Sequence, residues 1–258
     1  MDWKGAAAAR AKPLFARFAP LLVLSLSAVL AGCAAVKPRS DVGLPRAEPD
    51  VSELAWQRIR FRIHRYGNEP PQWHIDALLA HRVAAPALQR ERKSIVLWRF
   101  HRRAADDAAG HSFSFLTYAS REVNDALCRA LQEDSLVEEM KRAGHIDEVE
   151  CEGFPADKER LVEATSDIRW SLSLQRTWPY YIMGVSEMWL RLIDERARQL
   201  ADSSPSHTLE QTAAIYETIN RTVTLAWRKE GEHAFLHHLG ALFGYEEIEI
   251  TEKKLQRF

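Results

Sequence analysis

The sequence predicts a mixed α+β fold, because four strand-like segments, the first and last of which alternate apolar and polar residues, are separated by segments with helical spacing. Alternation with period two is typical of a half-buried strand, whereas apolar residues three and four apart are typical of a helix with one buried face. Of the 258 residues, 46% are hydrophobic and 28% are charged, as in an ordinary globular protein. The bulk composition therefore adds no sign of a disordered or fibrous chain.

The first strand is predicted over residues 56–65. Ile59, Phe61 and Ile63 fall on one side of it, and arginines alternate with them on the other side. A helix is predicted over residues 72–84, where four apolar residues share one stripe: Ile75, Leu78, Leu79 and Val83. Pro86 is expected to end this helix, because proline lacks the backbone N–H that a helix interior needs.

Two strands and a second helix follow. Residues 94–102 are apolar on both sides, which predicts a strand with both faces covered. A third strand is predicted over 111–118 and a helix over 121–143. Ser120 is expected to cap the start of this helix and Gly144 to close it. A fourth strand is predicted over 146–152.

This succession of strand, helix, strand, strand, helix and strand is the order of the ferredoxin-like (βαββαβ) fold. In that fold the antiparallel strands lie in the order 4-1-3-2, and the helices cover one face. The fourth strand would then lie beside the first, with opposite charges facing each other on the helix-free face. Such cross-strand pairs contribute about 0.2–1 kcal/mol each. The residues concerned are Arg58, Arg60 and Arg62 on the first strand and Glu148, Glu150 and Glu152 on the fourth.

The C-terminal part is expected to extend this sheet. Residues 167–176 alternate again and predict a fifth strand, and Trp178-Pro179 is expected to begin a helix over 179–201. A further helical stretch is predicted over 207–243, divided at Gly231, followed by a short strand over 245–251. Together these elements predict a single α+β domain over residues 51–258.

The N-terminus has the parts of a secretory signal: a basic leader, an apolar core over 21–31, and small residues before a cysteine. The apolar core is too short for a transmembrane helix, which needs roughly 20 residues. It ends in Leu30-Ala31-Gly32-Cys33, which resembles the lipobox of bacterial lipoproteins. That resemblance implies a signal peptide over residues 1–32 and a Cys33 that is diacylated and becomes the first residue after cleavage.

The segment behind Cys33 is expected to be a tether. Residues 33–50 contain three prolines and few large apolar side chains, so they predict a semi-extended spacer. Ala34 and Ala35 follow the cysteine where lipoproteins kept at the inner membrane commonly carry aspartate. The resemblance therefore implies a lipid-anchored protein at the periplasmic face of the outer membrane.

Charge and cysteine content fit an exported protein. The leader holds four Lys/Arg and one Asp, which leaves 31 basic and 35 acidic residues after cleavage and a formal net charge of −4. A nucleic-acid-binding protein would show a basic excess, so no nucleic-acid partner is predicted. Cys128 and Cys151 either form one disulfide in an oxidising compartment or remain two buried thiols.

Five arginines are candidates for binding an anionic ligand, because a guanidinium group donates two parallel hydrogen bonds to a carboxylate or phosphate. They are Arg58, Arg60, Arg62, Arg99 and Arg169. The alternative is that they are neutralised by the glutamate row or by acidic C-terminal helices. Stability loss without loss of anion affinity in an Arg60 variant would favour this alternative.

Two other patterns are weaker. Glu230, His233 and His237 share one side of a predicted helix and are metal-ligand candidates, but their order differs from the His-Glu-x-x-His motif of zinc proteases. Residues 184–188 (GVSEM) lack the second glycine and the preceding strand of a nucleophile elbow. No metal, cofactor or catalytic residue is therefore predicted.

The most aromatic region of the chain includes Trp178, Tyr180 and Tyr181. It is either core, where a strand end meets a helix start, or an exposed surface for a lipid or protein partner. The leading functional prediction is a non-enzymatic accessory lipoprotein that binds an envelope protein, as an assembly factor or as an inhibitor of an incoming toxin. The alternatives are a hydrolase or metal-dependent enzyme acting on a lipid or cell-wall substrate, and a binder of a small anionic ligand.

Overall fold

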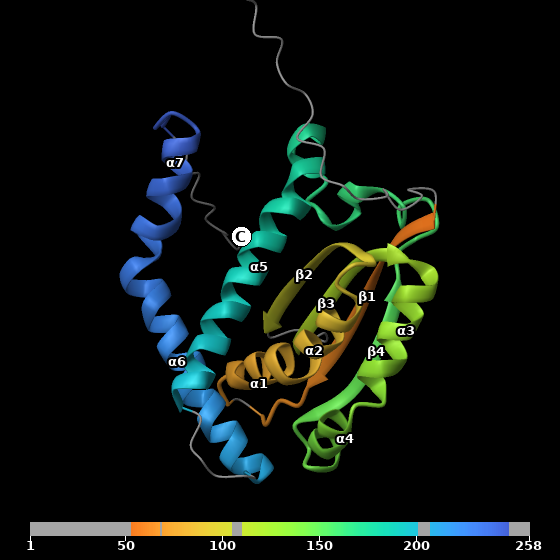
Figure 1. The fold of residues 1–258 in the computed structure, drawn as a ribbon, viewed down its shortest axis with the longest axis vertical. Coiled ribbons are helices and arrows are strands. Elements are labelled where there is room, and N and C mark those ends of the chain that lie inside the picture. Colours follow the sequence, from red (N-terminus) through yellow and green to blue (C-terminus); the bar gives the residue numbers. More distant parts are fainter. Residues whose placement is uncertain (1–52, 68, 105–109, 201–206, 248–258) are drawn as a thin grey trace, which may run out of the picture. The chain divides into compact units, whose positions relative to one another are not determined.

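A four-stranded antiparallel sheet forms the centre of this mixed α+β fold (Figure 1). The computed structural model describes residues 53–67, 69–104, 110–200 and 207–247. The predicted signal peptide, Cys33 and the tether lie outside the described residues. The strands are β1 (Leu54–Ile63), β2 (Ile95–Ala104), β3 (His111–Ser120) and β4 (Ile146–Gly153), in the order β2-β3-β1-β4. The fourth strand is therefore next to the first, as predicted.

The helix between β1 and β2 is longer than the sequence predicts. It consists of α1 (Trp73–Leu78), a π-helical turn η2 (Leu79–Ala84) and α2 (Ala85–Glu91). The prediction that Pro86 ends this helix is wrong. Pro86 lies in the first turn of α2, directly after the π-helical turn.

The second helical connection is two helices instead of one. Ser120 caps α3 (Arg121–Gln132), as predicted, by accepting a hydrogen bond from the Val123 N–H. The chain then breaks, and the Asp134 side chain caps α4 (Ser135–Arg142) through the N–H groups of Leu136 and Val137. Gly144 closes α4 with a φ of 77°, a conformation that favours glycine.

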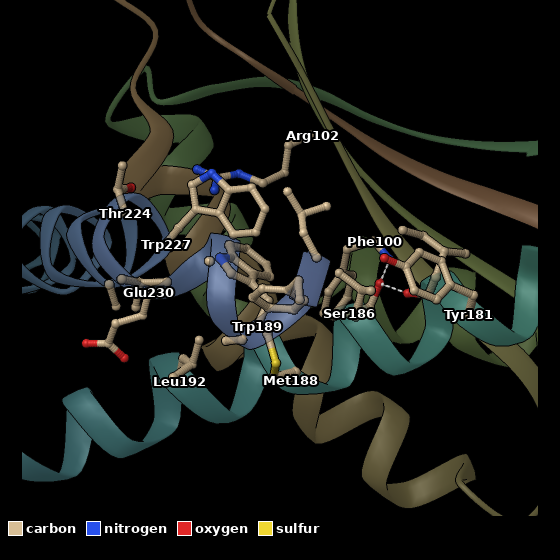
Figure 2. Close-up of a pocket in the computed structure, with 18 of the residues that line it drawn as sticks. Phe100, Arg102, Tyr181, Ser186, Met188, Trp189, Leu192, Thr224, Trp227 and Glu230 are labelled. Atoms are coloured by element: carbon tan, nitrogen blue, oxygen red, sulfur yellow. Dashed lines mark hydrogen bonds between the residues drawn. The ribbon is translucent and has the colours of Figure 1, made fainter. Parts of the chain in front are cut away.

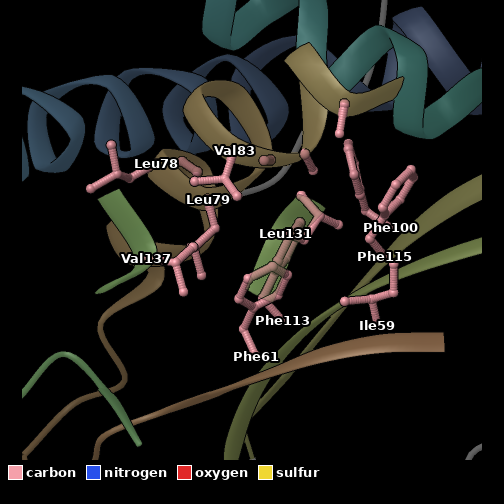
Figure 3. Close-up of a cluster of buried hydrophobic side chains, with 14 of the residues drawn as sticks. Ile59, Phe61, Leu78, Leu79, Val83, Phe100, Phe113, Phe115, Leu131 and Val137 are labelled. Atoms are coloured by element: carbon pink, nitrogen blue, oxygen red, sulfur yellow. The ribbon is translucent and has the colours of Figure 1, made fainter. Parts of the chain in front are cut away.

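The main hydrophobic core lies between one face of the sheet and these helices (Figure 3). Alternate residues of the strands point into it because side chains on a strand alternate between faces. The buried side chains of the strands pack against Leu and Val side chains of the helices, among them Leu78, Leu79, Val83, Leu131 and Val137. The sheet contributes Ile59, Phe61, Phe113 and Phe115.

The other face of the sheet is covered in part by the segment that follows β4. A smaller apolar cluster forms there between the strands and residues around η3 (Val162–Thr165). Trp56 Nε1 donates to the carbonyl oxygen of Val162 at 3.2 Å, and the Tyr118 hydroxyl donates to that of Arg160 at 2.8 Å. These bonds hold the segment on the sheet. The prediction that both faces of β2 are covered holds at Leu97 and Trp98, which are fully buried, but not at His101, which is exposed.

The predicted fifth strand is wrong, because α5 (Leu172–Leu200) begins inside it. Asp167 accepts a hydrogen bond from the Arg169 N–H in a turn, and the Ser171 hydroxyl accepts one from the Leu174 N–H at the start of the helix. Ile168 is 83% exposed, so the alternation there does not mark a buried face. Residues 167–176 therefore have the alternating pattern of a strand but do not pair with any strand of the sheet.

Pro179 lies inside α5, although the sequence predicts that it begins the helix. Proline cannot donate to the carbonyl four residues earlier, which here belongs to Gln175. The Ser166 hydroxyl donates to that carbonyl at 2.7 Å instead. A side chain from outside the helix thus satisfies the acceptor that the proline leaves free.

The last elements are α6 (Leu209–Gly231), a π-helical turn η4 (Glu232–His237) and α7 (His238–Leu242). Thr208 and Gln211 form a capping box at the start of α6. The predicted division at Gly231 is confirmed. A Cβ atom on Gly231 would lie 2.7 Å from the Trp227 ring, so glycine lets that ring pack closely. Residues 245–247 form no strand, and the rest of the predicted last strand lies outside the described residues.

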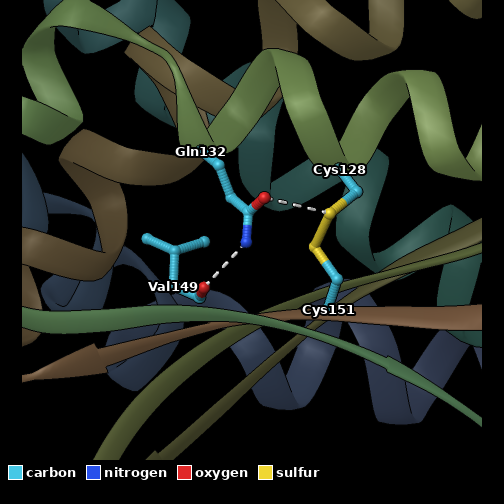
Figure 4. Close-up of a disulfide and its surroundings, with 4 residues drawn as sticks. All are labelled: Cys128, Gln132, Val149 and Cys151. Atoms are coloured by element: carbon cyan, nitrogen blue, oxygen red, sulfur yellow. Dashed lines mark hydrogen bonds between the residues drawn. A yellow bond between two sulfur atoms is a disulfide. The ribbon is translucent and has the colours of Figure 1, made fainter.

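Cys128 of α3 and Cys151 of β4 form a disulfide, with their Cα atoms 6.1 Å apart (Figure 4). Of the two alternatives left open by the sequence, the structure has the bridge. Beside it, Gln132 Nε2 donates to the carbonyl oxygen of Val149 at 3.1 Å. Both interactions hold α3 against the edge strand β4.

In the part of the chain that the structure describes, no helix is both long and apolar enough to cross a membrane.

Replacing Cys128 and Cys151 together by serine is expected to lower the free energy of unfolding by about 3 kcal/mol, because a bridge across 23 positions restricts the unfolded chain. The urea midpoint of the variant measures this loss. Reduced wild-type protein is the control and should unfold at the same urea concentration as the double variant. An unchanged midpoint after reduction would contradict the stabilising role of the bridge.

Candidate functional site

The candidate site is a cleft between α5 and the C-terminal half of α6 with η4 (Figure 2). Helix α5 packs against β2 and against α6, and α6 packs against α1. Near Phe100 of β2 the helices enclose a cavity of about 580 Å³, within the 300–1,000 Å³ range of small-molecule pockets. The cleft thus has a floor on the sheet and two helical walls.

Apolar and aromatic side chains make up most of the cavity wall. Val185, Trp189 and Leu192 come from α5, whereas Trp227 of α6 and Phe235 of η4 lie on the other side. The ionisable side chains among the described lining residues are Arg102, Tyr181 and Glu230. This lining suits an apolar group with one polar end.

Ser186 attaches the α5 wall to the sheet. Strand β2 is at the sheet edge, so its outward N–H groups lack a partner strand. The Phe100 N–H donates to Ser186 Oγ at 3.1 Å, and that hydroxyl donates to the Ile182 carbonyl oxygen at 2.8 Å. Ser186 lies inside a helix and in two hydrogen bonds, so residues 184–188 do not form a nucleophile elbow.

Arg102 of β2 is the cation of the cavity lining. Its Nε donates to Asp76 Oδ2 at 2.9 Å, and its Nη2 donates to the Trp73 carbonyl oxygen at 2.7 Å. A third bond from Nη2 reaches Asn220 Oδ1 of α6 at 3.1 Å. The guanidinium carbon lies 4.9 Å from the ring centres of both Trp73 and Trp189, close enough for cation–π attraction.

Asp76 explains why Arg102 is held so firmly. The Asp76 carboxylate is fully buried, and an unpaired buried charge is very costly. It has two partners: Arg102, and His111, whose Nε2 lies 3.1 Å from Asp76 Oδ1. This buried ion pair joins α1, β2 and β3 directly beneath the cleft.

The arginine row on β1 faces the glutamate row on β4, as predicted. The backbone register pairs Arg58 with Glu152, Arg60 with Glu150 and Arg62 with Glu148. Ion-pair distances are 3.5 Å for the first pair, 2.6 Å for the second and 3.6 Å for the third, and Arg60 also contacts Glu152. These three arginines are therefore neutralised by neighbouring carboxylates.

Arg99 and Arg169 differ from that row. Arg169 lies in the turn before α5 and pairs with Asp167, so it is not part of the sheet face. Arg99 of β2 donates to the Thr165 carbonyl oxygen at 3.2 Å, and its Nε is buried without a hydrogen-bond partner among the described residues. Burial, and next the positive charge of Arg58, lower the pKa of Arg99 to about 10.

His101 lies beside Arg99 on the same strand, and its Nδ1 is 3.2 Å from Arg99 Nη2. Since the guanidinium can only donate, the His101 ring accepts this bond and must be neutral there. Burial, followed by the charges of Arg99, Arg58 and Arg103, lowers the pKa of His101 to about 4. The ring is therefore uncharged at neutral pH.

A polar contact that the sequence does not reveal joins His81, Tyr216 and Asp194. The Tyr216 hydroxyl bonds to His81 Nδ1, and His81 Nε2 lies 3.4 Å from Asp194 Oδ1. Burial raises the pKa of Tyr216 to about 12, so its hydroxyl stays protonated. Burial also lowers the pKa of His81. This group ties η2, α5 and α6 together.

The candidate metal ligands do not converge. Glu230 is at the end of α6, whereas His233 and His237 belong to η4 and stack with ring centres 5.0 Å apart. Within the described ranges, no group of three or more His, Cys, Asp or Glu residues has a metal-binding arrangement. These three residues therefore gain no support as a metal site from the geometry.

The aromatic region at the start of α5 adjoins the cleft, because Tyr181 belongs to the cavity lining. Trp178 is partly buried and packs against Trp170 and Tyr181, with ring centres 4.9 and 5.2 Å away. Tyr180 is 56% exposed, and Tyr181 contributes to the cavity lining. These residues therefore do not form part of the buried core.

Replacing Arg60 by alanine is expected to lower the free energy of unfolding by about 1 kcal/mol, because two partly exposed ion pairs are lost. Binding of inorganic phosphate should not change, since these charges are already paired. Urea unfolding and calorimetric titration measure the two effects. Arg169→Ala is the control and should leave stability unchanged; phosphate affinity that falls with Arg60→Ala would contradict the structural role.

The free energy of unfolding is expected to fall as the pH drops from 6.5 towards 4. In this range His101 binds a proton in the unfolded chain but stays neutral in the folded protein. His101→Gln removes this site and should make the urea midpoint less dependent on pH across that range. Part of the dependence should remain, since burial also lowers the pKa of His81. An NMR titration that gives His101 a midpoint near 6.5 in the folded protein would contradict this expectation.

Comparison with known proteins gives no relative from which a function could be transferred. No protein-family model, no curated protein and no solved structure matches the chain. The chemistry of the cleft itself is therefore the basis for inferring function.

Proposed function

We propose that this protein is a lipid-anchored, non-enzymatic accessory protein of the bacterial envelope that binds an apolar partner in the cleft between α5 and α6. The observation that carries the proposal is the apolar cavity of about 580 Å³. Its described lining contains no histidine, cysteine or lysine that could act as a base or nucleophile. Binding is therefore the function that this geometry supports best.

Exposed apolar side chains around the cleft support a protein partner. Trp227 is 57% exposed and Leu236 is 58% exposed, and both line the cavity. Tyr180 of α5, which precedes the lining residue Tyr181, is a third large exposed side chain. Contiguous apolar surface of this kind is typical of interaction sites, and aromatic residues are enriched at their centres.

The leader supports the location. The ending Leu30-Ala31-Gly32-Cys33 resembles a lipobox, and acyl chains on Cys33 would hold the domain at the outer membrane. The disulfide between Cys128 and Cys151 is in accord with an oxidising compartment such as the periplasm. The domain is proposed to face that compartment and present the cleft there.

The assignment of the first hundred described residues to the ferredoxin-like fold is part of the same proposal. Read from the β4 edge, the strand order 4-1-3-2 and the antiparallel pairing of neighbours support it. This fold hosts many unrelated functions, so it does not name one. The helices α5 and α6, which build the cleft, are additions to that fold.

A small anionic ligand on the sheet face that carries Arg99 is a second candidate function, and one observation favours it. Arg99 has a buried Nε without a hydrogen-bond partner among the described residues, and its guanidinium group donates to the Thr165 carbonyl oxygen instead of to a carboxylate there. An anion beside Arg99 and Arg58 would offset their mutual repulsion. The cleft is favoured over this site because it has a defined cavity.

A photoreactive amino acid at Leu236 is expected to crosslink one defined envelope protein in intact cells, because this side chain is exposed and lines the cleft. The same probe at Arg121, whose side chain is 76% exposed at the start of α3, is the matched control and should not capture that protein. Mass spectrometry identifies the captured species and measures its yield.

The anchor is tested in the same cells with Cys33→Ala, which removes the site of acylation. We expect the uncleaved precursor to be missing from the outer-membrane fraction and the Leu236 crosslink to disappear. Equal crosslinking from Leu236 and Arg121 would contradict partner binding in the cleft. Normal sorting of the Cys33→Ala chain would contradict the lipoprotein assignment.

A further inference from the structure

We infer that the inner end of the cleft binds a long-chain fatty acid, with the hydrocarbon chain between α5 and α6 and the carboxylate at Arg102. This inference deepens the proposed function because it names a ligand for the same cleft. It depends on the cavity and on Arg102, whereas the protein partner depends on the exposed side chains at the cleft opening. The two can therefore fail separately.

The shape of the lining supports an occupant that is apolar along most of its length. Side chains from both helices face the cavity over more than one turn, from Ile182 to Leu192 on α5 and from Val223 to Trp227 on α6. Figure 2 shows Met188 and Trp189 of α5 among the side chains around this space. A flexible hydrocarbon chain can follow such a wall without leaving buried polar groups unpaired.

The position of Arg102 supports an acidic head group. A guanidinium group has five N–H donors, and those of Nε and Nη2 already bind Asp76, the Trp73 carbonyl and Asn220. Nη1 has no hydrogen bond to any described residue, so its two donors remain for a ligand. Carboxylate is the acceptor that fits them best, because charge-assisted hydrogen bonds are the stronger ones.

The surroundings of Arg102 hold it ready for this role. The ring centres of Trp73 and Trp189 each lie 4.9 Å from the central carbon of the guanidinium group. The side chain is 25% exposed, so it is accessible from the cavity while its other edge is fixed in the core. Little conformational freedom would be lost on binding, which favours affinity.

The position of Glu230, the carboxylate of the lining, is compatible with a fatty acid whose carboxylate lies at Arg102. Glu230 is exposed near the end of α6, whereas Arg102 is on β2 at the floor of the cavity. A fatty acid with its head at Arg102 would extend its uncharged chain towards the helix ends. The reverse orientation would place the carboxylate of the fatty acid beside that of Glu230. Repulsion between the two negative charges therefore favours the proposed orientation.

The test is photolabelling of the mature lipoprotein in isolated membranes with a diazirine-bearing hexadecanoic acid, followed by purification and peptide mapping. We expect the label on peptides from α5 and α6 that line the cavity. Hexadecanoic acid should compete at a concentration at least tenfold lower than hexadecylamine, which has the same chain and the opposite charge. Equal competition by the two would overturn the role of Arg102.

Matched tryptophan variants on α6 test the location. Ala226→Trp adds bulk to the cavity wall and should reduce labelling on the order of tenfold, because a filled cavity leaves no room for the chain. Ala214→Trp changes an exposed residue of the same helix outside the lining and should label normally. Circular dichroism and urea unfolding verify that both variants fold.

Unchanged labelling of Ala226→Trp, or equal loss in both variants, would overturn the inference. The protein partner is scored separately by the crosslink from Leu236 in cells. In one outcome, Ala226→Trp abolishes the Leu236 crosslink and fatty-acid labelling never maps to the cleft. The cleft would then bind the protein partner alone. Labelling that maps to the cleft without any Leu236 crosslink would support the fatty acid and contradict the protein partner.

Discussion

The buried Asp76 carboxylate is the constraint on which the arrangement of the domain depends. A charge with no exposed surface must be compensated inside the protein, and Arg102 and His111 provide the compensation. Because Arg102 also binds Asn220 and packs on Trp189, the same ion pair fixes α5 and α6 relative to the sheet. The ion pair between Asp76 and Arg102 therefore helps to set the geometry of the cleft.

The sheet could be predicted well from the sequence because its signals are local. In β1, arginines alternate with apolar residues, so only one register buries Ile59 and Phe61 and exposes the charges. The order of strands and helices along the chain predicted that β4 lies beside β1, and the pairing of the arginine and glutamate rows agrees with that position. Where alternation was short and both sides were weakly defined, as around Ile168, the prediction of a strand was wrong.

The candidate site could be predicted only in part, because its residues come from distant parts of the chain. Tyr181 was predicted as a partner-surface residue and lines the cavity. Arg102 lies near the end of β2 and Asp76 lies in the short helix α1, and no motif in the sequence singles out either residue. One signal was available: Asp76 falls beside the apolar stripe of its helix. A carboxylate at such a position implies a buried partner, although the sequence cannot tell which cation supplies it.

The two edges of the sheet are closed in different ways, by the α5 hydroxyl of Ser186 at β2 and by Gln132 with the neighbouring disulfide at β4. Open strand edges invite pairing between molecules. If the domain is tethered as proposed, diffusion in a plane keeps copies at high local density, where such pairing would lead to polymers. Because both strand edges are covered, molecules of this protein that are crowded on a membrane would not pair edge to edge and would stay monomeric.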